Sequence, residues 1–450
     1  MATLSPISAR RPGRSIALPY AANFDALRAD LPGGDLPWLA SGRTAAMARF
    51  TELGLPSRKV EEWKYSNLAP LAKTDFTAPA QSDVEAARAE IISRFTKEPA
   101  THHRLVFVNG MLDSELSDRL DPADGVRVLG LVDAMAGDAA FLKGHLAEIP
   151  SFNGNALAAL NSAFMYDGCI VALDADAEVA LELLFVAAPS AGIPAYHPRI
   201  SIAAGANSRC VLQERHVALG ESEYWSNPVT TINLESGATV RHYKLQDESL
   251  NAWQTSLTKA RLAENADYEN FIVTTGGRFA RNEIEVALEG AGATCTLGGS
   301  FMLAGKQHVD NRLYVDHIAP NCTSRQVYKG VLDDSAHGVF QAKTIVQRHA
   351  QKSDGHQLSR ALMLSPNAVM DAKPELEIYA DDVKCSHGAT VGELDDDQMF
   401  YLRARGIDKA VARGLLIAAF LNEHLELVTD DGAREMLGAA VSQWLGGLDV

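Results

Sequence analysis

The chain has 450 residues, of which 47% are hydrophobic and 22% are charged, and its formal net charge is −16. These values are those of an ordinary soluble globular protein that is long enough to bury a large core, in more than one domain. The negative charge argues against general nucleic-acid binding, which needs a basic surface, and no apolar run reaches the length of a membrane span.

The N-terminal segment is basic. Arg10, Arg11 and Arg14 precede the first acidic residue, Asp25. This pattern is faintly like an organelle transit peptide, but the segment lacks the apolar stretch of a secretory signal. We therefore expect a mobile tail of about 20 residues on a cytoplasmic protein of bacterial type.

Helical patterns follow over residues 24 to about 97. The stretches TAAMARFTELG and VEAARAEIISRF carry apolar residues three and four positions apart, which predicts helices. Between them, RKVEEWKYSNL places Trp63 and Tyr65 among charges. Packing of these rings on the domain is favoured over a surface for a partner. Residues 1–100 are therefore predicted to form an N-terminal helical domain.

The middle of the chain is rich in β-strand patterns. Residues 101–168 open with a convincing strand, RLVFVNG, and then alternate strand-like and helix-like pieces. Over residues 169–392 the helical period disappears, and short β-rich runs recur about every ten residues with Gly, Asn, Asp or Pro in most gaps. The pattern alone does not separate a sandwich, a propeller or a solenoid. The lack of Asn-Gly hairpin turns and of a fixed blade-length repeat favours a solenoid.

The five cysteines form neither a CxxC pair nor a disulfide framework, and they suit a reducing compartment. Four of them match no site signature and are predicted to pack in the core: Cys169, Cys210, Cys295 and Cys322. No phosphate-binding loop is present, because Gln307 follows Gly305-Lys306 where a P-loop needs Ser or Thr. The chain itself is therefore not expected to hydrolyse ATP.

The fifth cysteine lies where the strand pattern gives way to a helical one. In the run Cys385-Ser386-His387-Gly388, a strand would direct the thiol and the imidazole to the same face, about 7 Å apart. After Gly392, acidic residues precede an apolar group and basic residues follow it, with Gly406 closing the stretch. Such a distribution of charge predicts a short helix.

The tail after Ile407 is predicted to form an amphipathic helix with more apolar surface than one contact needs. One face carries Ile407, Val411, Leu415, Ala418, Leu421, Leu425 and Val428, and a second stripe carries Leu416, Phe420 and Leu427. Such a helix either packs in a core, here against a last helix around Met436 and Trp444, or docks a partner.

The stretch CSHGAT followed by DQMFYLRARGI resembles the SufB/SufD family of iron–sulfur cluster assembly scaffolds, and its Cys-Ser-His-Gly version is similar to the SufD branch. The resemblance continues through QHVDNRLYVDHIAPNCTSRQVYKGVLDDSAHGVFQAKTIVQ and, weakly, SRKVEEWKYSNL, so it covers most of the chain beyond Arg58. It implies a mainly β fold with a right-handed parallel β-helix core at residues 169–392. Helical domains at residues 1–100 and 393–450 flank this core, with residues 101–168 as a mixed transition.

The resemblance also implies a non-catalytic scaffold subunit that pairs with a SufB-type subunit and docks a SufC-type ABC ATPase in two copies. The C-terminal helices bind the ATPase in this family, which points to the residues Ile407, Val411, Leu415, Leu416, Phe420 and Leu421. His387 is implied to lie at the interface with SufB and to assist nascent cluster assembly, with Cys385 beside it.

The implied iron–sulfur cluster is transient and shared with the partner. Cys385 and His387 alone cannot complete a four-coordinate site, so no cluster is expected on this chain by itself. Flavin is associated with complexes of this family, but no residue here points to it.

Other interpretations remain open at this stage. A Cys-x-His pair is weak evidence alone, because a strand-end His usually bonds a carbonyl and a Cys usually packs. A second interpretation is that the chain is the cluster-bearing SufB-type subunit, against which the CSHGA motif and the lack of a Cys-rich segment argue. A third is a β-helix carbohydrate lyase or hydrolase, with Asp310 and Asp316 near His308 as its acids, but nothing marks the chain for secretion.

Overall fold

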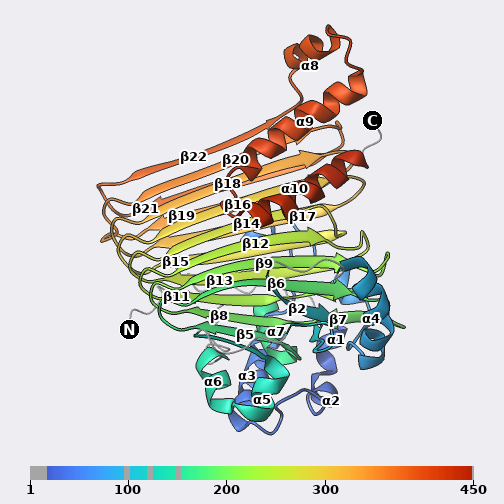
Figure 1. The fold of residues 1–450 in the computed structure, drawn as a ribbon, viewed down its shortest axis with the longest axis vertical. Coiled ribbons are helices and arrows are strands. Elements are labelled where there is room, and N and C mark those ends of the chain that lie inside the picture. The colour runs from blue at the N-terminus through green and yellow to red at the C-terminus, as the bar shows by residue number, and fades with distance from the viewer. Residues whose placement is uncertain (1–17, 96–101, 119–124, 147–153, 448–450) are drawn as a thin grey trace.

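The computed structural model describes residues 18–95, 102–118, 125–146 and 154–447. The basic segment around Arg10, Arg11 and Arg14 lies outside these residues. Two large sheets face each other, and the chain passes from one to the other at nearly every step, so that each pair of strands adds one rung to a solenoid (Figure 1). The predicted mainly β fold with a parallel β-solenoid is therefore confirmed.

The first sheet follows the spatial order β21-β19-β17-β15-β13-β11-β8-β5-β4, with β1, β7 and β10 off this path. Its strands are β1 (Phe76–Thr77), β4 (Val126–Gly130), β5 (Gly168–Leu173), β7 (Ile193–Tyr196), β8 (Arg199–Ala204), β10 (Trp225–Ser226), β11 (Val229–Leu234), β13 (Trp253–Leu262), β15 (Phe279–Leu288), β17 (His308–His317), β19 (His337–Val346) and β21 (Val369–Ile378).

The second sheet follows the order β22-β20-β18-β16-β14-β12-β9-β6-β2-β3. Its strands are β2 (His103–Val108), β3 (Met111–Leu112), β6 (Glu178–Ala187), β9 (Arg209–Ala218), β12 (Thr239–Asp247), β14 (Asp267–Thr274), β16 (Thr294–Leu303), β18 (Thr323–Leu332), β20 (Asp354–Met363) and β22 (Lys384–Gly392). From β6 to β22 every neighbouring pair in this sheet is parallel.

The turn that leads from the first sheet to the second repeats one backbone feature from rung to rung. A residue with positive φ stands in each of these turns from β5 to β20: Asp176, Asn207, Gly237, Asn265, Gly292, Asn321 and Lys352. Most are Asn, Asp or Gly, which adopt this conformation at low cost. Each donates its backbone N–H to a carbonyl of the next rung, as Asn207 does to Ser236 at 2.9 Å. The turns therefore stack as regularly as the strands.

One continuous apolar cluster runs through the interior between the two sheets, next to a buried polar group that contains Glu214, His216 and His242. Four cysteines belong to the apolar cluster, as predicted: Cys169, Cys210, Cys295 and Cys322. All five cysteines lie within the described residues, and Cys385 is the one among them that is partly exposed.

Helices surround the lower part of the solenoid (Figure 1), and among them α4 packs on the second sheet against β2 and β6. They are α1 (Pro19–Ala22), α2 (Phe24–Leu27), α3 (Pro37–Leu53), α4 (Gln81–Phe95), α5 (Leu131–Gly137), α6 (Ala139–Leu146) and α7 (Ala156–Phe164). The two helical patterns read near the N-terminus correspond to α3 and α4. Every residue of α7 is buried, because this helix packs on the first sheet, where Ala158 contacts Val229 of β11 and Leu257 of β13.

A strap, defined as residues 58–68, crosses the outer face of the first sheet. The ring of Trp63 is buried and lies 3.8 Å from the guanidinium carbon of Arg281 on β15. Ser66 donates a hydrogen bond to Asp310 on β17 at 2.5 Å. Glu61 pairs with Lys373 on β21 at 2.7 Å. The prediction that the aromatic rings of this stretch pack on the domain is confirmed for Trp63.

Three helices follow the last strand: α8 (Asp396–Arg403), α9 (Lys409–Leu425) and α10 (Asp431–Gly446). α9 and α10 pack on the outer face of the second sheet, whereas α8 has no buried residue and projects beyond the last rung (Figure 1). The predicted short helix and both tail helices are thus present. Among the described helices, none combines the length and the apolar character needed to cross a membrane.

Candidate functional site

The thiol and the imidazole singled out in the sequence lie on β22, the last strand of the second sheet. β22 pairs with β20 in a register that sets Cys385 opposite Gly355 and His387 opposite Gln357. Its other edge pairs with no strand of the described residues. An unpaired edge presents a row of backbone N–H and C=O groups that can bind another strand, so both residues lie where a partner strand can be added.

The Cys385 thiol is half-buried at the open end of the solenoid. Its sulfur lies 3.6 Å from the position that a Cβ on Gly355 would take, and Ser324 Oγ and His317 Nε2 lie 3.5 and 3.8 Å from the same point. Burial raises the pKa of the thiol, and a backbone hydrogen bond from Gly355 offsets part of this effect. The thiol therefore carries its proton at neutral pH.

His317 is a buried imidazole next to this thiol. Ser353 Oγ donates to the carbonyl of Ala350 at 2.9 Å, so its lone pair accepts from His317 Nδ1 at 3.1 Å. His317 Nε2 is then the acceptor for the hydroxyl of Ser324 at 2.8 Å. Burial lowers the pKa of His317 to about 4, so the ring is neutral at pH 7. The imidazole beside the Cys385 thiol is therefore uncharged, whereas the negative charge of Asp354 raises the pKa of the thiol further.

The His387 side chain is exposed, on the same face of β22 as Cys385, because residues two apart in a strand share a face. Ser386 points the other way and hydrogen-bonds His356 on β20, whose Nε2 lies 2.9 Å from Asp354. The described residues offer His387 no hydrogen-bond partner, so both of its ring nitrogens are available to a ligand or a second chain.

Cys385 and His387 do not form a complete metal site. Across the described parts of the chain, no three His, Cys, Asp or Glu side chains gather closely enough to hold a metal ion. Zinc and iron–sulfur sites need about four protein ligands or ligand equivalents. Any metal bound by these two residues therefore needs ligands from elsewhere.

The reactivity of Cys385 provides a direct test of this geometry. With iodoacetamide under native conditions, Cys385 is expected to be alkylated first, because the other four cysteines are buried. Since burial raises its pKa, the rate at pH 7 should fall below that of free cysteine and rise about tenfold per pH unit up to pH 8, as the thiolate fraction does. Mass spectrometry of the native chain and of Cys385→Ser measures this, and a second fast site at Cys322 would contradict it.

Asp310 and Asp316 are the acids that a carbohydrate lyase or hydrolase would use. Both are buried and bonded to other side chains of the chain. Asp310 is fully buried and forms an ion pair with Arg281 as well as the hydrogen bond from Ser66. Asp316 is buried as well and accepts a hydrogen bond from Gln347 at 2.9 Å. Neither carboxylate lies in an accessible cleft with the other, so the structure does not bring them together as a catalytic pair.

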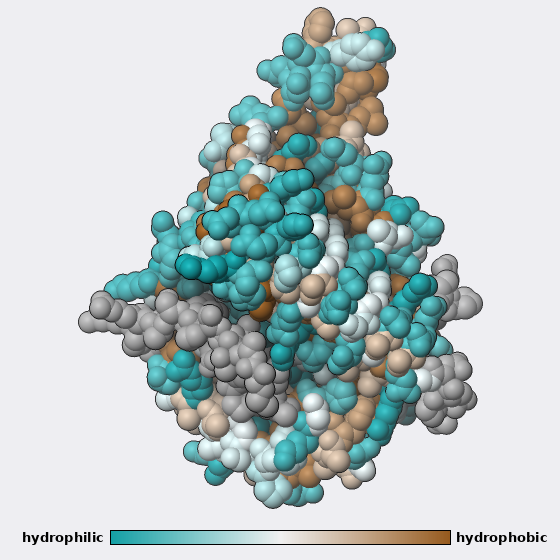
Figure 2. Space-filling model, turned by 90° about the vertical axis from the view of Figure 1, so that its left-hand side faces the viewer, coloured by the Kyte–Doolittle hydropathy of each residue, from teal (hydrophilic) through white to brown (hydrophobic). Residues whose placement is uncertain are grey.

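The apolar face predicted on the tail helix is divided by the structure. Leu421 is fully buried against the second sheet, in the chain's own core. Val411 and Leu415, in the first half of α9, are 53% and 49% exposed, and hydrophobic residues gather on one side of the projecting end in Figure 2. Ile407, Leu416 and Phe420 are partly buried.

Two further exposed rings were missed in the sequence. Phe400 and Tyr401 on α8 are 74% and 57% exposed. The sequence contained a signal for this exposure, because the aromatic pair lies in a short helix that is too polar to have a buried face. The structure adds that α8 projects beyond the last rung, so that both rings face solvent.

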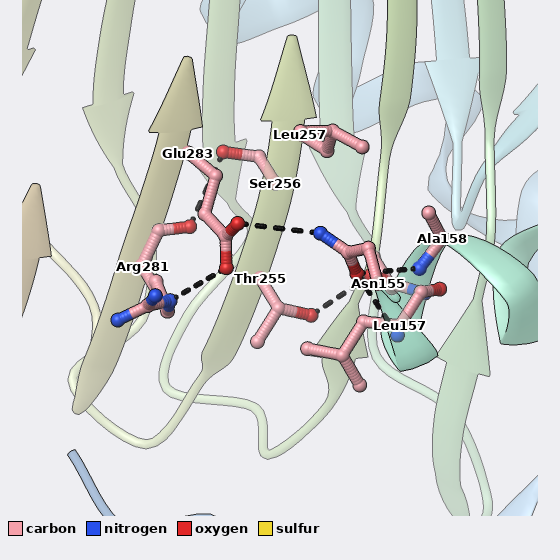
Figure 3. A pocket seen from close by; sticks show the side chains of 9 residues that line it. Asn155, Leu157, Ala158, Thr255, Ser256, Leu257, Arg281 and Glu283 are labelled. Atoms are coloured by element: carbon pink, nitrogen blue, oxygen red, sulfur yellow. Dashed lines mark hydrogen bonds and ion pairs between the residues drawn. The ribbon is translucent and has the colours of Figure 1, made fainter. Parts of the chain in front are cut away.

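A small pocket lies between α7 and the first sheet (Figure 3). Asn155 caps α7 by accepting from the backbone N–H groups of Leu157 and Ala158, and its amide donates to Glu283 at 3.2 Å. Glu283 also accepts from Arg281 at 2.8 Å. With a volume of about 10 Å³, the pocket has room for one water molecule, so these contacts tie α7 to β15 and do not form a ligand site.

Comparison with known proteins places these features in context. Residues 185–420 match the family profile described as "SUF system FeS cluster assembly, SufBD core domain", and residues 15–182 match "SufBD protein N-terminal region". The chain is 32% identical to the iron–sulfur cluster assembly protein SufD of Escherichia coli over 419 residues, which cover 89% of this chain and 92% of that protein. It is 30% identical over 400 residues to an iron–sulfur cluster assembly SufBD family protein of Synechocystis sp., with 87% of each chain covered.

Proposed function

Because the chain belongs to the SufB/SufD family of the SUF iron–sulfur cluster assembly system, we propose that it is the SufD-type, non-catalytic scaffold subunit of a SUF complex. Membership of this family implies a complex with SufB and SufC partners in general. The observation that carries the finer assignment is β22, whose open edge presents Cys385 and His387 without a third ligand.

In this proposal the partner scaffold adds its own strand edge next to β22. Addition of a strand to an open sheet edge supplies backbone hydrogen bonds, and it sets partner side chains beside Cys385 and His387. The nascent cluster is the substrate of the complex. This chain contributes one imidazole and one thiol, and the SufB-type partner contributes the remaining ligands. The two ligand sets then meet only in the assembled complex.

The burial of the other cysteines supports the SufD-type role over the cluster-bearing one. Cys169, Cys210 and Cys295 are fully enclosed, and burial raises their pKa values well above the ordinary range. Such thiols do not serve as accessible ligands. A chain with one accessible thiol depends on a partner for the principal ligands.

The proposed docking surface for a SufC-type ATPase consists of Phe400, Tyr401, Val411 and Leu415, the exposed apolar side chains of α8 and α9. Four exposed apolar residues on one projecting end are a feature of interaction sites. The sequence has no phosphate-binding loop, so the partner supplies the ATPase site. Closure of two ATPase copies would move the paired scaffolds and expose the interface ligands in one state of the complex. The free cysteines suit the reducing cytoplasm.

The experiment is an anaerobic co-purification of this chain with SufB-type and SufC-type partners, followed by native mass and iron analysis. We expect a complex with two ATPase copies and iron that requires the SufB-type partner. Leu415→Glu should lower the retained ATPase by about tenfold or more, since it places a charge in an apolar contact. Leu250→Glu is the matched control, because Leu250 is 54% exposed in a distant loop, and both variants should keep the thermal midpoint.

Two outcomes would contradict this proposal. Stoichiometric iron on the chain purified without partners would identify it as the cluster carrier. If the Leu415→Glu variant retains as much ATPase as the original chain, the assignment of the docking surface is wrong. The proposed interface with the SufB-type partner does not depend on this result.

A further inference from the structure

A column of rings runs along the outer face of the first sheet, at the first residue of four successive strands. Trp253, Phe279, His308 and His337 begin β13, β15, β17 and β19, and the register sets each opposite the next. The ring centroids are separated by 5.1, 5.0 and 4.6 Å in that order. These four residues, the ring column, therefore form a continuous aromatic surface in which each strand contributes one ring.

A pocket of about 310 Å³ lies against the ring column. The strap closes one side with Arg58, Tyr65 and Asn67, and the turns before β15 and β17 contribute Arg278 and Lys306. A volume near 300 Å³ is at the lower end of those that hold small ligands. The pocket is therefore large enough for a molecule of several functional groups, unlike the water-sized pocket beside α7.

The charged side chains that line the pocket are all cationic. Its lining contains Arg58, Arg278 and Lys306 but no carboxylate. Arg58 donates through Nε to the carbonyl of Lys64, and Arg278 lies 5.6 Å from the ring centroid of Trp253. None of the three cations forms an ion pair within the described residues. In a chain with a net charge of −16, three unneutralised cations at one pocket mark a site for an anion.

The neighbouring acids make their contacts with other groups and not with these three cations. Asp371 pairs with His337 at 2.8 Å, and Asp310 accepts from Ser66 and pairs with Arg281. Since the Ser66 hydroxyl proton goes to Asp310, its lone pair accepts from His308 Nε2 at 2.9 Å.

We propose that this pocket binds a small phosphate-bearing anion, with Arg58, Arg278 and Lys306 around the phosphate oxygens and the ring column beside any planar group attached to them. Guanidinium groups match the geometry of phosphate oxygens, and the ammonium adds a third charge. Two sources share this chemistry: an inorganic oxyanion such as pyrophosphate, and a nucleoside monophosphate, whose base would contact Tyr65 and the rings.

The site lies apart from the proposed cluster interface. Its lining residues come from the strap, the first sheet and the turns of the solenoid, and none belongs to β22, α8 or α9. Binding at the pocket and assembly of the SUF complex can therefore be tested separately, so the failure of one proposal leaves the other standing.

The experiment titrates pyrophosphate, and in parallel adenosine monophosphate, into the full chain by calorimetry. The test variant is Arg278→Ala with Lys306→Ala, and the control is Lys59→Ala with Lys143→Ala, which removes two exposed lysines outside the pocket. We expect the test variant to bind about a hundredfold more weakly, roughly tenfold per cation removed, and the control to bind as the original chain does. Both changes are at exposed positions, so thermal unfolding should be unaltered.

The arms separate the two sources. Tighter binding of adenosine monophosphate, with the excess lost in Tyr65→Ala, indicates a nucleoside phosphate, whereas equal affinities that Tyr65→Ala leaves unchanged indicate an inorganic oxyanion. Failure of both ligands to bind at millimolar concentration, or wild-type affinity in the test variant, would overturn the proposal.

Discussion

Replacing Asp310 by Ala is expected to lower the free energy of unfolding by about 3–5 kcal/mol. Asp310 and Arg281 are both completely enclosed between the strap and the first sheet, and they form an ion pair. Removal of one member leaves a charge in a medium that solvates it poorly, and this penalty exceeds the modest contribution of the pair itself.

The loss spreads through the contacts of the strap. Asp310 also accepts from Ser66 at 2.5 Å and from Gln341 at 3.0 Å, and both donors would lose a charged acceptor. Arg281 keeps Glu283 at 2.8 Å, so the charge is not left entirely alone. The ring of Trp63 rests on the same guanidinium, so the strap loses its bond to β17 and keeps its contact on β15 with an Arg281 that has one carboxylate partner fewer.

Chemical unfolding monitored by circular dichroism measures this effect. The control is Glu178→Ala, which breaks an exposed ion pair with Arg209. The side chain of Glu178 is 66% exposed and that of Arg209 is 70% exposed. That change should cost at most about 1 kcal/mol. Equal unfolding midpoints for the two variants would show that the buried pair does not anchor the strap.

The second large effect concerns His387. Under the proposed function, His387→Ala is expected to reduce the iron incorporated by the complete complex about tenfold or more, the scale on which metal sites respond to lost ligand contacts. The imidazole is exposed on the open edge strand, so its removal should leave the fold intact. The loss would therefore appear in iron content and not in thermal stability.

A matched histidine makes this test specific. His356 lies on β20, one strand away, and its ring bonds to Ser386 on the opposite face from His387. His356→Ala removes an imidazole from the same end of the solenoid and is expected to leave iron incorporation unchanged. Native mass spectrometry should show the same subunits in both complexes. If His387→Ala takes up as much iron as the original chain, the assignment of the site fails.

The sequence predicted where the strands of the solenoid lie in the chain, but it did not predict which strands pair with one another. Gly, Asn and Asp marked most turns, and the structure shows several of them at positive φ. The rungs differ in length, however: Thr239 lies opposite Asp267, Asp267 opposite Thr294, and Thr294 opposite Thr323. A repeat whose length changes leaves no fixed period in the sequence, so the parallel β-helix itself came from the family resemblance.

The site was predictable only as far as local geometry reaches. The two-residue period of a strand placed Cys385 and His387 on one face. It could not bring His317 and Gly355 to the thiol, because the register between distant rungs sets that contact. In the tail, periodicity described one apolar face and a second apolar stripe beside it. The structure shows that Leu421 covers the second sheet whereas Leu415 is half exposed.

The strap also has a consequence for how the protein is made. Ser66 and its partner Asp310 are 244 positions apart in the chain, and Glu61 and Lys373 are 312 apart. The strap therefore leaves the ribosome long before the strands that it crosses, and it has no docking surface until β15, β17 and β21 have been synthesised and stacked. Contacts between such distant segments form late and slow the folding of a chain. The N-terminal strap therefore docks late in biosynthesis, after the solenoid has folded as far as β21.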